Sequence, residues 1–255
     1  MILTQQVKRL RNKSRMNSFN AALQILEKDK PNNISVINFI KDNTIYSVDI
    51  IGKSVLVKGE SDRKWVYISS KDENELSIIK SKLSSEDENF ASIDDWMFPI
   101  LTEGKELAWD LSMIQFYLPD DVQISSPEYK TVPLTDSDAQ NVYDNSEYKE
   151  YISIEYVTDC IQKGISVGIS ENGKLVSWSI TQDDGAIGFL HTLNDYRRKG
   201  YGYNITLSMI EQVRNSGGLP FANVLQTNKR SINLLLKLGF KESKEIHWFQ
   251  VKNNS

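Results

Sequence analysis

The chain is poor in the residues that build disulfide-stapled, metal-binding or membrane-embedded proteins. Its 255 residues include one cysteine, Cys160, and two histidines. A single thiol excludes an internal disulfide, and Cys160 and His247 have no companions at metal-ligand spacing, so we expect no metal. No run approaches the roughly 18 uncharged apolar residues of a membrane span, and the first residues lack a signal peptide's apolar stretch. These absences favour a cytoplasmic protein in a reducing compartment.

Charge of either sign is also not in large excess. The formal net charge is −4, which gives no overall attraction to nucleic acid. A basic run near the start of the chain would suit a nucleic-acid-associated module, but it lacks interleaved aromatic residues, so a solvated helix face is the simpler interpretation. That run comprises Lys8, Arg9, Arg11, Lys13 and Arg15. We therefore expect neither nucleic acid nor membrane as a partner, and the oligomeric state stays open.

The length and the 40% hydrophobic content suit one large domain or two of about 125 residues. We place an N-terminal α/β domain at residues 1–127 and a second domain at 128–255. In the first domain the patterns predict an amphipathic helix over 5–27, strands over 45–51, 54–59 and 64–70, and a helix over 74–83. Helix, three strands and helix echo the second domain, which indicates a duplicated fold with a degenerate first copy.

The second domain alternates short periodic segments with turn residues. Asn172-Gly173 tolerates positive φ at both central positions of a hairpin, and Asp183-Asp184-Gly185 makes the next turn. The expected strands are 130–134, 166–170, 174–181, 186–193, 221–225 and 246–251, and the expected helices are 136–145, 154–163, one with Tyr203, Leu207, Ile210 and Val213 on one face, and 229–238 after Asn228. This order predicts an α+β fold, a mixed α/β sheet flanked by helices.

The segment "DYRRKGYGYN", residues 195–204, follows a predicted strand and opens a predicted helix. Backbone N–H groups in a helix's first turn have no intrahelical acceptor and carry the positive end of the helix dipole, so they favour an anion. Gly200 and Gly202 let phosphate oxygens approach this backbone. A dinucleotide fingerprint is excluded because its third glycine falls on Ile205, and the triphosphate-loop near match at residues 168–175 ends on Leu175, which has no hydroxyl.

A third phosphate pattern, R/Q-x-x-G-x-G/A, is met at residues 197–202. The surrounding "TLNDYRRKGYG" resembles the strand-to-helix junction of the GNAT superfamily of N-acyltransferases, and "NKRSINLLLKLGF", residues 228–240, resembles that superfamily's second cofactor segment. "VSWSI", residues 176–180, followed by a turn and "TLNDYR", is similar to the glycine N-acyltransferase branch, whose chains also carry a GNAT-like half before the catalytic one. The specific resemblance covers residues 128–255.

The resemblance implies a cofactor, acetyl-coenzyme A or another acyl-coenzyme A. It also implies three groups of binding residues. The backbone of Leu190, His191, Thr192 and Leu193 would pair with the pantetheine amides, Arg198, Lys199, Gly200, Tyr201, Gly202 and Tyr203 would carry the pyrophosphate, and Asn228 and Ser231 would line the channel near the thioester. In this superfamily the side chain at the position of Arg197 often contacts either the protein itself or the cofactor, so we assign it no role in the chemistry.

Two positions depart from the family's chemistry. Leu235 stands where many members have a tyrosine acid, and Ala186 stands where the glycine N-acyltransferases have an acidic base. His191 is the best substitute base by position and by its intrinsic pKa near 6.5, although a strand histidine is more often packed than catalytic. Asp184 is a second candidate, but an Asp-Asp-Gly tip is usually a solvated turn.

These observations predict an acyl-coenzyme A-dependent N-acyltransferase. It would transfer acetyl to the amine of a small molecule or amino acid by direct attack on the thioester. A coenzyme-binding, catalytically impaired or regulatory protein of the same fold is the alternative, because the tyrosine and the acid are missing. The sequence does not identify the acceptor amine or the length of the acyl group.

Overall fold

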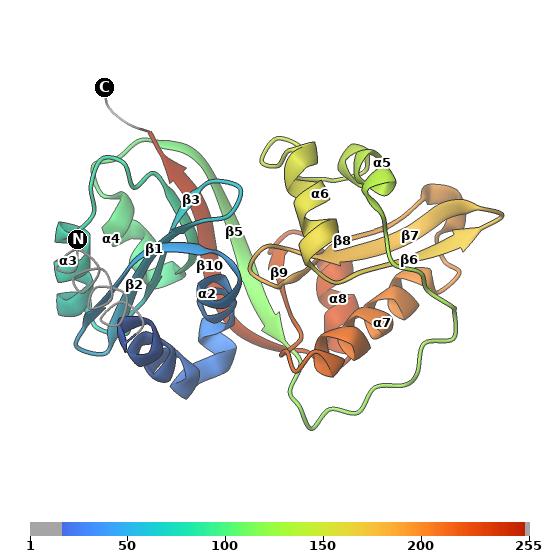
Figure 1. Ribbon diagram of the computed structural model, residues 1–255, viewed down its shortest axis with the longest axis horizontal. Coiled ribbons are helices and arrows are strands. Elements are labelled where there is room, and N and C mark those ends of the chain that lie inside the picture. The colour runs from blue at the N-terminus through green and yellow to red at the C-terminus, as the bar shows by residue number, and fades with distance from the viewer. Residues whose placement is uncertain (1–16, 253–255) are drawn as a thin grey trace, which may run out of the picture. The chain divides into compact units, whose positions relative to one another are not determined.

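The chain folds into two compact units (Figure 1). The computed structural model describes residues 17–252. The first unit comprises Met1–Met113 together with Lys244–Ser255, and the second comprises Ile114–Ser243. This division differs from the sequence-based boundary after residue 127, because it falls within two long strands, and the C-terminal strand is counted with the first unit.

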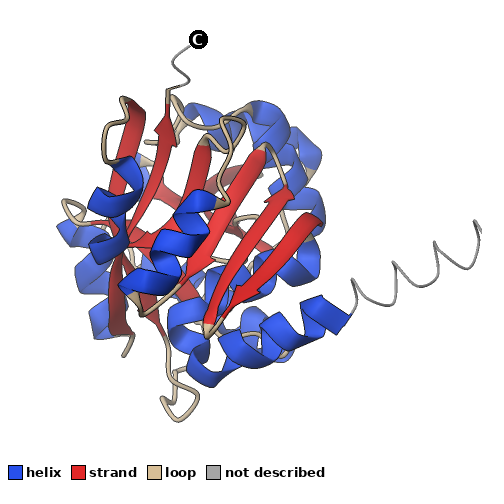
Figure 2. Ribbon diagram, turned by 90° about the vertical axis from the view of Figure 1, so that its left-hand side faces the viewer, coloured by secondary structure: helices blue, strands red, loops and turns tan. Residues whose placement is uncertain are grey.

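The first unit is a sheet with helices on both faces. Its strands are β1 (Thr44–Ile51), β2 (Ser54–Glu60), β3 (Lys64–Ser69), β4 (Asn89–Asp94), most of β10 (Lys241–Val251) and the first part of β5 (Leu107–Tyr117), and its helices are residues 17–26, η1 (Glu27–Asp29), α2 (Lys30–Asp42), α3 (Glu73–Ser81), η2 (Asp95–Met97) and α4 (Phe98–Thr102). The strands lie side by side in the order β1-β2-β3-β4-β10-β5 (Figure 2).

Residues that alternate along β2 and β3 build two cores in the first unit. Val57 and Tyr67 face a cluster that contains Ile37 and Phe39 of α2. Their neighbours in the strands face the other way, into a cluster with Leu76 and Ile79 of α3. Successive strand side chains point to opposite faces, so each strand is buried on both faces, which explains the consecutive apolar residues at 55–57 and 65–68.

Strand β10 is fixed in the first unit by polar contacts as well as by its ladder with β4. His247 is buried, its ring stacks on Phe98 at 4.0 Å, and its two ring nitrogens lie 2.9 Å from Asp110 and 3.0 Å from Asp95. Carboxylates only accept hydrogen bonds. The imidazole therefore ties β10 both to β5 and to the turn after β4.

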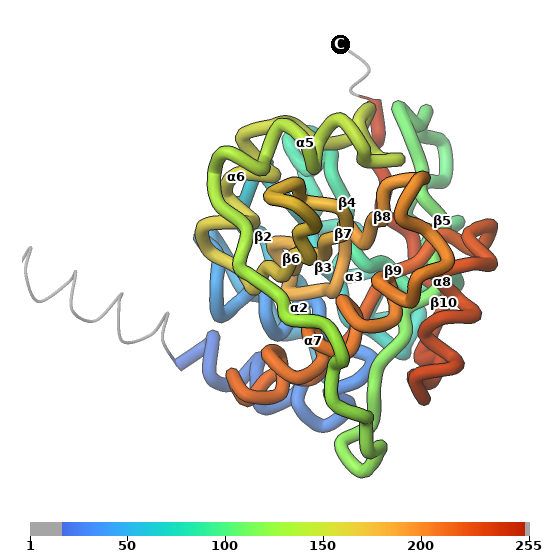
Figure 3. The backbone as a smooth tube through the Cα atoms, turned by 90° about the vertical axis from the view of Figure 1, so that its right-hand side faces the viewer, coloured from blue at the N-terminus to red at the C-terminus, as the bar shows by residue number. Residues whose placement is uncertain are grey.

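The second unit holds a separate three-stranded sheet, β6-β7-β8, covered on both faces. In chain order its elements are the end of β5, η3 (Asp136–Asp138), α5 (Ala139–Asp144), α6 (Ile154–Lys163), β6 (Ser166–Glu171), β7 (Lys174–Thr181), β8 (Ile187–Thr192), η4 (Asn194–Tyr196), α7 (Tyr201–Asn215), β9 (Phe221–Leu225), α8 (Lys229–Lys237) and the start of β10. Helices α5 and α6 cover one face and α7 the other (Figures 1 and 3).

Most predicted elements are confirmed, including the hairpin at Asn172-Gly173, where φ is +51° and +78°. The strand predicted at 130–134 is wrong: Val132 makes one isolated bridge to Gly168, and Pro133 has no N–H to continue a ladder. The helix predicted over 5–27 is helical over 17–26, and its earlier part lies outside the described residues. The patterns missed α2, β4 and β5.

The described chain contains no helix both long enough and apolar enough to span a lipid bilayer.

Replacing His247 with leucine should lower the free energy of unfolding by about 2 kcal/mol, because the imidazole's polar contacts with Asp110 and Asp95 are lost. Urea unfolding followed by tryptophan fluorescence measures this loss, since Trp65 and Trp248 form an edge-to-face pair in the same unit. The matched control is Lys71→Ala, which breaks an ion pair to Asp29 from a side chain that is 77% exposed and should change stability by less than about 0.5 kcal/mol. Equal losses in the free energy of unfolding for the two substitutions would contradict the role of His247 in holding β10 to β5 and to the turn after β4.

Candidate functional site

The start of α7 presents backbone N–H groups that no helical carbonyl accepts. Asn204 N donates to Gly200 O at 3.1 Å, and this is the helix's first internal bond. The N–H groups of residues 201–203 therefore precede any intrahelical acceptor. Gly200 adopts the left-handed conformation with φ +83°, and Arg198 does so with φ +65°. The chain thus turns sharply just before the helix, whose uncapped first N–H groups are of the kind that favours an anion.

Asn204 fixes this turn from beneath. Its side chain is buried, its Nδ2 donates to Gly200 O at 3.1 Å, and its Oδ1 accepts from Glu128 N at 2.7 Å. Tyr129 adds an edge-to-face contact with Tyr201 at 4.9 Å. The connection between β5 and α5 runs along α7 at this point (Figure 3). The loop is therefore held in its conformation before any ligand arrives.

The cations of the loop are partly engaged within the protein. Arg197 Nε donates to Thr192 O at 3.1 Å, so this side chain folds back onto the end of β8. Lys199 lies 3.5 Å from Glu171 and 4.9 Å from the centre of the Tyr196 ring. Two of the three cations of the loop thus contact the protein itself, whereas the side chain of Arg198 is exposed.

Strands β8 and β9 lie side by side in Figure 1, but within residues 17–252 no ladder joins them. Strand β8 pairs with β7 alone and carries an irregularity at Phe189, where φ is +53°. Thr192 O is directed away from β7, since Arg197 bonds it. Leu190–Thr192 therefore forms a free strand edge, to which an extended ligand could add hydrogen bonds. From this edge the chain continues through η4 to α7.

His191 lies on β8 with its ring stacked on Trp178, centroids 5.0 Å apart. It is half-buried, and burial together with the nearby Arg197 guanidinium lowers its pKa below the ordinary value, an effect that Glu147 partly opposes. The imidazole is therefore neutral near pH 7 and can accept a proton.

Asp184 does not lie in a solvated turn, contrary to the expectation from its Asp-Asp-Gly sequence. Its side chain is fully buried. Its carboxylate accepts from Ala186 N at 3.0 Å, and Asn223 Nδ2 of β9 lies 3.4 Å from it. The turn geometry was predicted from Gly185, but the inward direction of the neighbouring side chain depends on β9, which a local sequence pattern does not contain.

The second predicted cofactor segment forms α8. Asn228 caps the helix by accepting from Ser231 N at 3.1 Å, as its sequence position indicated. Leu235 is buried in the core between α7 and α8, so the position where the tyrosine was expected is a packing position here.

The first unit repeats the same topology with the opposite chemistry. Helix α3 connects β3 to its parallel neighbour β4, as α7 connects β8 to β9. Asp72 caps α3 by accepting from the N–H groups of Asn74 and Glu75, and the first turn carries Glu73 and Glu75. The donors that α7 presents to a ligand are satisfied internally in α3, and two carboxylates repel an anion there.

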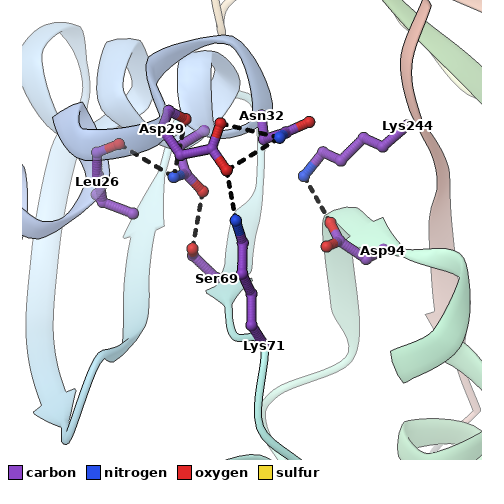
Figure 4. Close-up of polar contacts among 8 residues, drawn as sticks. Leu26, Asp29, Asn32, Ser69, Lys71, Asp94 and Lys244 are labelled. Atoms are coloured by element: carbon purple, nitrogen blue, oxygen red, sulfur yellow. Dashed lines mark hydrogen bonds and ion pairs between the residues drawn. The ribbon is translucent and has the colours of Figure 1, made fainter.

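Near the ends of β3 and β4, side chains of the first unit form hydrogen bonds and ion pairs with one another (Figure 4). Lys71 and Asn32 both donate to Asp29, at 2.5 and 2.9 Å, and Lys244 pairs with Asp94 at 2.5 Å. These groups satisfy one another. The first unit therefore retains the strand-helix-strand arrangement, but Asp72 already pairs the donors at the start of its α3.

The comparisons with known proteins agree with this fold. The model of the FR47-like protein family matches residues 164–249. A Drosophila protein is 17% identical, with a TM-score of 0.77 over 94% of this chain and 97% of that one. A GCN5-related N-acetyltransferase-like protein from Streptococcus suis is 14% identical, with a TM-score of 0.52 over 93% and 100%.

A tandem GNAT protein from the clavulanic acid biosynthesis pathway is 12% identical, with a TM-score of 0.53 over 95% of this chain and 96% of that one. The chain has the GNAT acetyltransferase fold. The mixed α/β fold class is thereby confirmed, and the match to a tandem protein over nearly the whole chain agrees with two GNAT-like halves. Membership of the glycine N-acyltransferase-like branch stays a prediction.

Sequence patterns did not identify Asn204 and Asn223 as residues of this site. Asn204 sat inside the quoted loop, and its role as a brace required Glu128, distant in sequence. Asn223 lay in a strand recognised only by its apolar neighbours. The one sequence signal for Asn223 would have been a polar residue between buried apolar ones in a short strand.

Proposed function

We propose that the protein is an acyl-coenzyme A-dependent N-acyltransferase that transfers acetyl to the amine of a small molecule. The observation that carries this proposal is the start of α7, where unpaired N–H groups adjoin the free edge of β8. The residues present fit the cofactor: an ideal Cβ at Gly202 would meet only Thr192 Oγ1, at 3.8 Å, so the hydrogen of glycine leaves the backbone open between α7 and β8.

The chain's own residues would divide the work as follows. The N–H groups of residues 201–203 would bind the pyrophosphate oxygens, each charge-assisted bond contributing on the order of 1.5 to 3 kcal/mol. The edge of Leu190–Thr192 aligns the pantetheine amides. Bound there, the coenzyme supplies an acyl group activated as a thioester.

Proton transfer would fall to His191. The amine nitrogen forms a bond to the acyl carbon while the carbon–sulfur bond breaks, and the imidazole takes the proton that the amine loses. The departing thiolate takes a proton from water, because Leu235 offers none. Holding amine and thioester together accounts for roughly 7 to 11 kcal/mol of the barrier in well-oriented reactions, so a weak base is sufficient.

The alternative of a coenzyme-binding protein without catalysis has specific support. Ala186 and Leu235, which stand in the places of the family's acid and tyrosine, are both buried apolar residues. An assay of turnover separates it from the enzyme.

Incubation of the protein with acetyl-coenzyme A and a panel of amines should release free thiol, which a chromogenic disulfide reagent detects. Gly202→Leu should abolish both coenzyme binding and thiol release, since the new side chain fills the gap between α7 and Thr192. Its melting temperature should stay close to that of the wild type because the fold leaves room at that Cβ. Gly202→Ala is the graded control. Coenzyme binding without thiol release on any amine would favour the alternative, and unchanged affinity in Gly202→Leu would refute the loop assignment.

The pH dependence of kcat/KM should show the titration of His191. An alkylamine of pKa about 10.4 gives log kcat/KM a slope of about 1 below its pKa. Because the pKa of His191 is lowered, the slope should increase to about 2 only below the ordinary histidine value of about 6.5. His191→Gln should keep a slope of 1 throughout. A slope of 2 that persists in this variant would place the base elsewhere.

A further inference from the structure

Asn223 carries a buried acceptor that the folded chain leaves unused. Its strand neighbours Ala222 and Val224 pack into the core with α7. Because side chains alternate along a strand, Asn223 points to the opposite face, where its Nδ2 lies 3.4 Å from Asp184 Oδ2. Its Oδ1 is buried and has no hydrogen-bond partner among the described residues.

The chemistry of Asp184 fixes which end of the amide faces which way. A carboxylate accepts hydrogen bonds and donates none, so the NH₂ group of Asn223 must face it. The amide oxygen is then the atom left over. An unsatisfied buried acceptor is destabilising, and most buried polar groups in native proteins are paired. The Oδ1 of Asn223 is therefore an acceptor that a bound ligand can pair with.

The position of Asn223 suits the reacting end of the proposed coenzyme site. Asp184 precedes β8 and Asn223 is central in β9, whereas the anion site lies beyond the other end of β8. A ligand anchored at α7 and extended back along the free edge of β8 runs toward Asn223. The acceptor nucleophile must meet the ligand at that far end.

We propose that Asn223 is the positioning residue for the acceptor amine. This inference rests on the proposed acyltransferase function. A neutral primary amine has two N–H groups and one lone pair. One N–H donates to Asn223 Oδ1, the lone pair faces the acyl carbon, and the second N–H gives up its proton through water to the His191 imidazole. A secondary amine lacks one of these donors, so it cannot do both.

The nearby hydroxyl of Ser179 supplies a matched control. It is also buried, on β7, but it already donates to Gly188 O at 2.7 Å. Its removal therefore changes buried polarity in the same unit without removing a free acceptor.

The experiment compares kcat/KM for a primary amine and for its N-methyl derivative in the wild type, Asn223→Leu and Ser179→Ala. The wild type should prefer the primary amine by at least about tenfold, the discrimination expected when a buried polar group loses its partner. Asn223→Leu should lower kcat for the primary amine by about 10- to 100-fold, reduce the preference, and leave the coenzyme Kd unchanged. Ser179→Ala should keep the wild-type preference.

Three results would overturn the inference. Equal kcat/KM of wild type and Asn223→Leu for the primary amine removes it while the acyltransferase function stands. If Asn223→Leu does not fold, equal rates of the wild type with the primary and N-methyl amines remove it without any variant. Absence of thiol release from every amine refutes the proposed function, and the inference falls with it.

Discussion

The proposed chemistry depends on one physical constraint, the unpaired backbone donors at the start of α7. They exist because a helix cannot satisfy its own first N–H groups, and they are exposed to a ligand because Gly200 takes a left-handed turn immediately before them. Asn204 holds that turn from the buried side. The cations around the loop are secondary to these backbone donors. Arg197 already donates to Thr192 O, and Lys199 already pairs with Glu171.

The two units show how one topology supports different chemistry. Each has a helix that connects two neighbouring strands. In the second unit that helix begins with glycines, and in the first it begins with Asp72, whose carboxylate takes up the donors. The ion pairs of Lys71 and Lys244 then occupy the strand ends of the first unit. The first unit instead holds β10, which His247 ties in place.

Local chemistry made much of this structure predictable from the sequence. Asn172-Gly173 forces a hairpin, and Asn228 caps α8, because the interactions involved span a few residues. Features that depend on distant partners were missed or misjudged. Asp184 is buried by a strand nearly forty residues away, and Pro133 interrupts a segment that otherwise reads as a strand. Strands β5 and β10 are each divided between the two units, and no local sequence pattern marks where the division falls.

The most direct test of the account is a calorimetric titration of the wild-type protein with acetyl-coenzyme A, which counts the sites per chain. Binding of one molecule per chain is the predicted result, because the donors at the start of α7 have no cap, whereas Asp72 caps those of α3, the matching helix of the first unit. Two molecules per chain would show that the first unit also binds coenzyme, and no measurable binding would contradict the assignment of α7 as a coenzyme site.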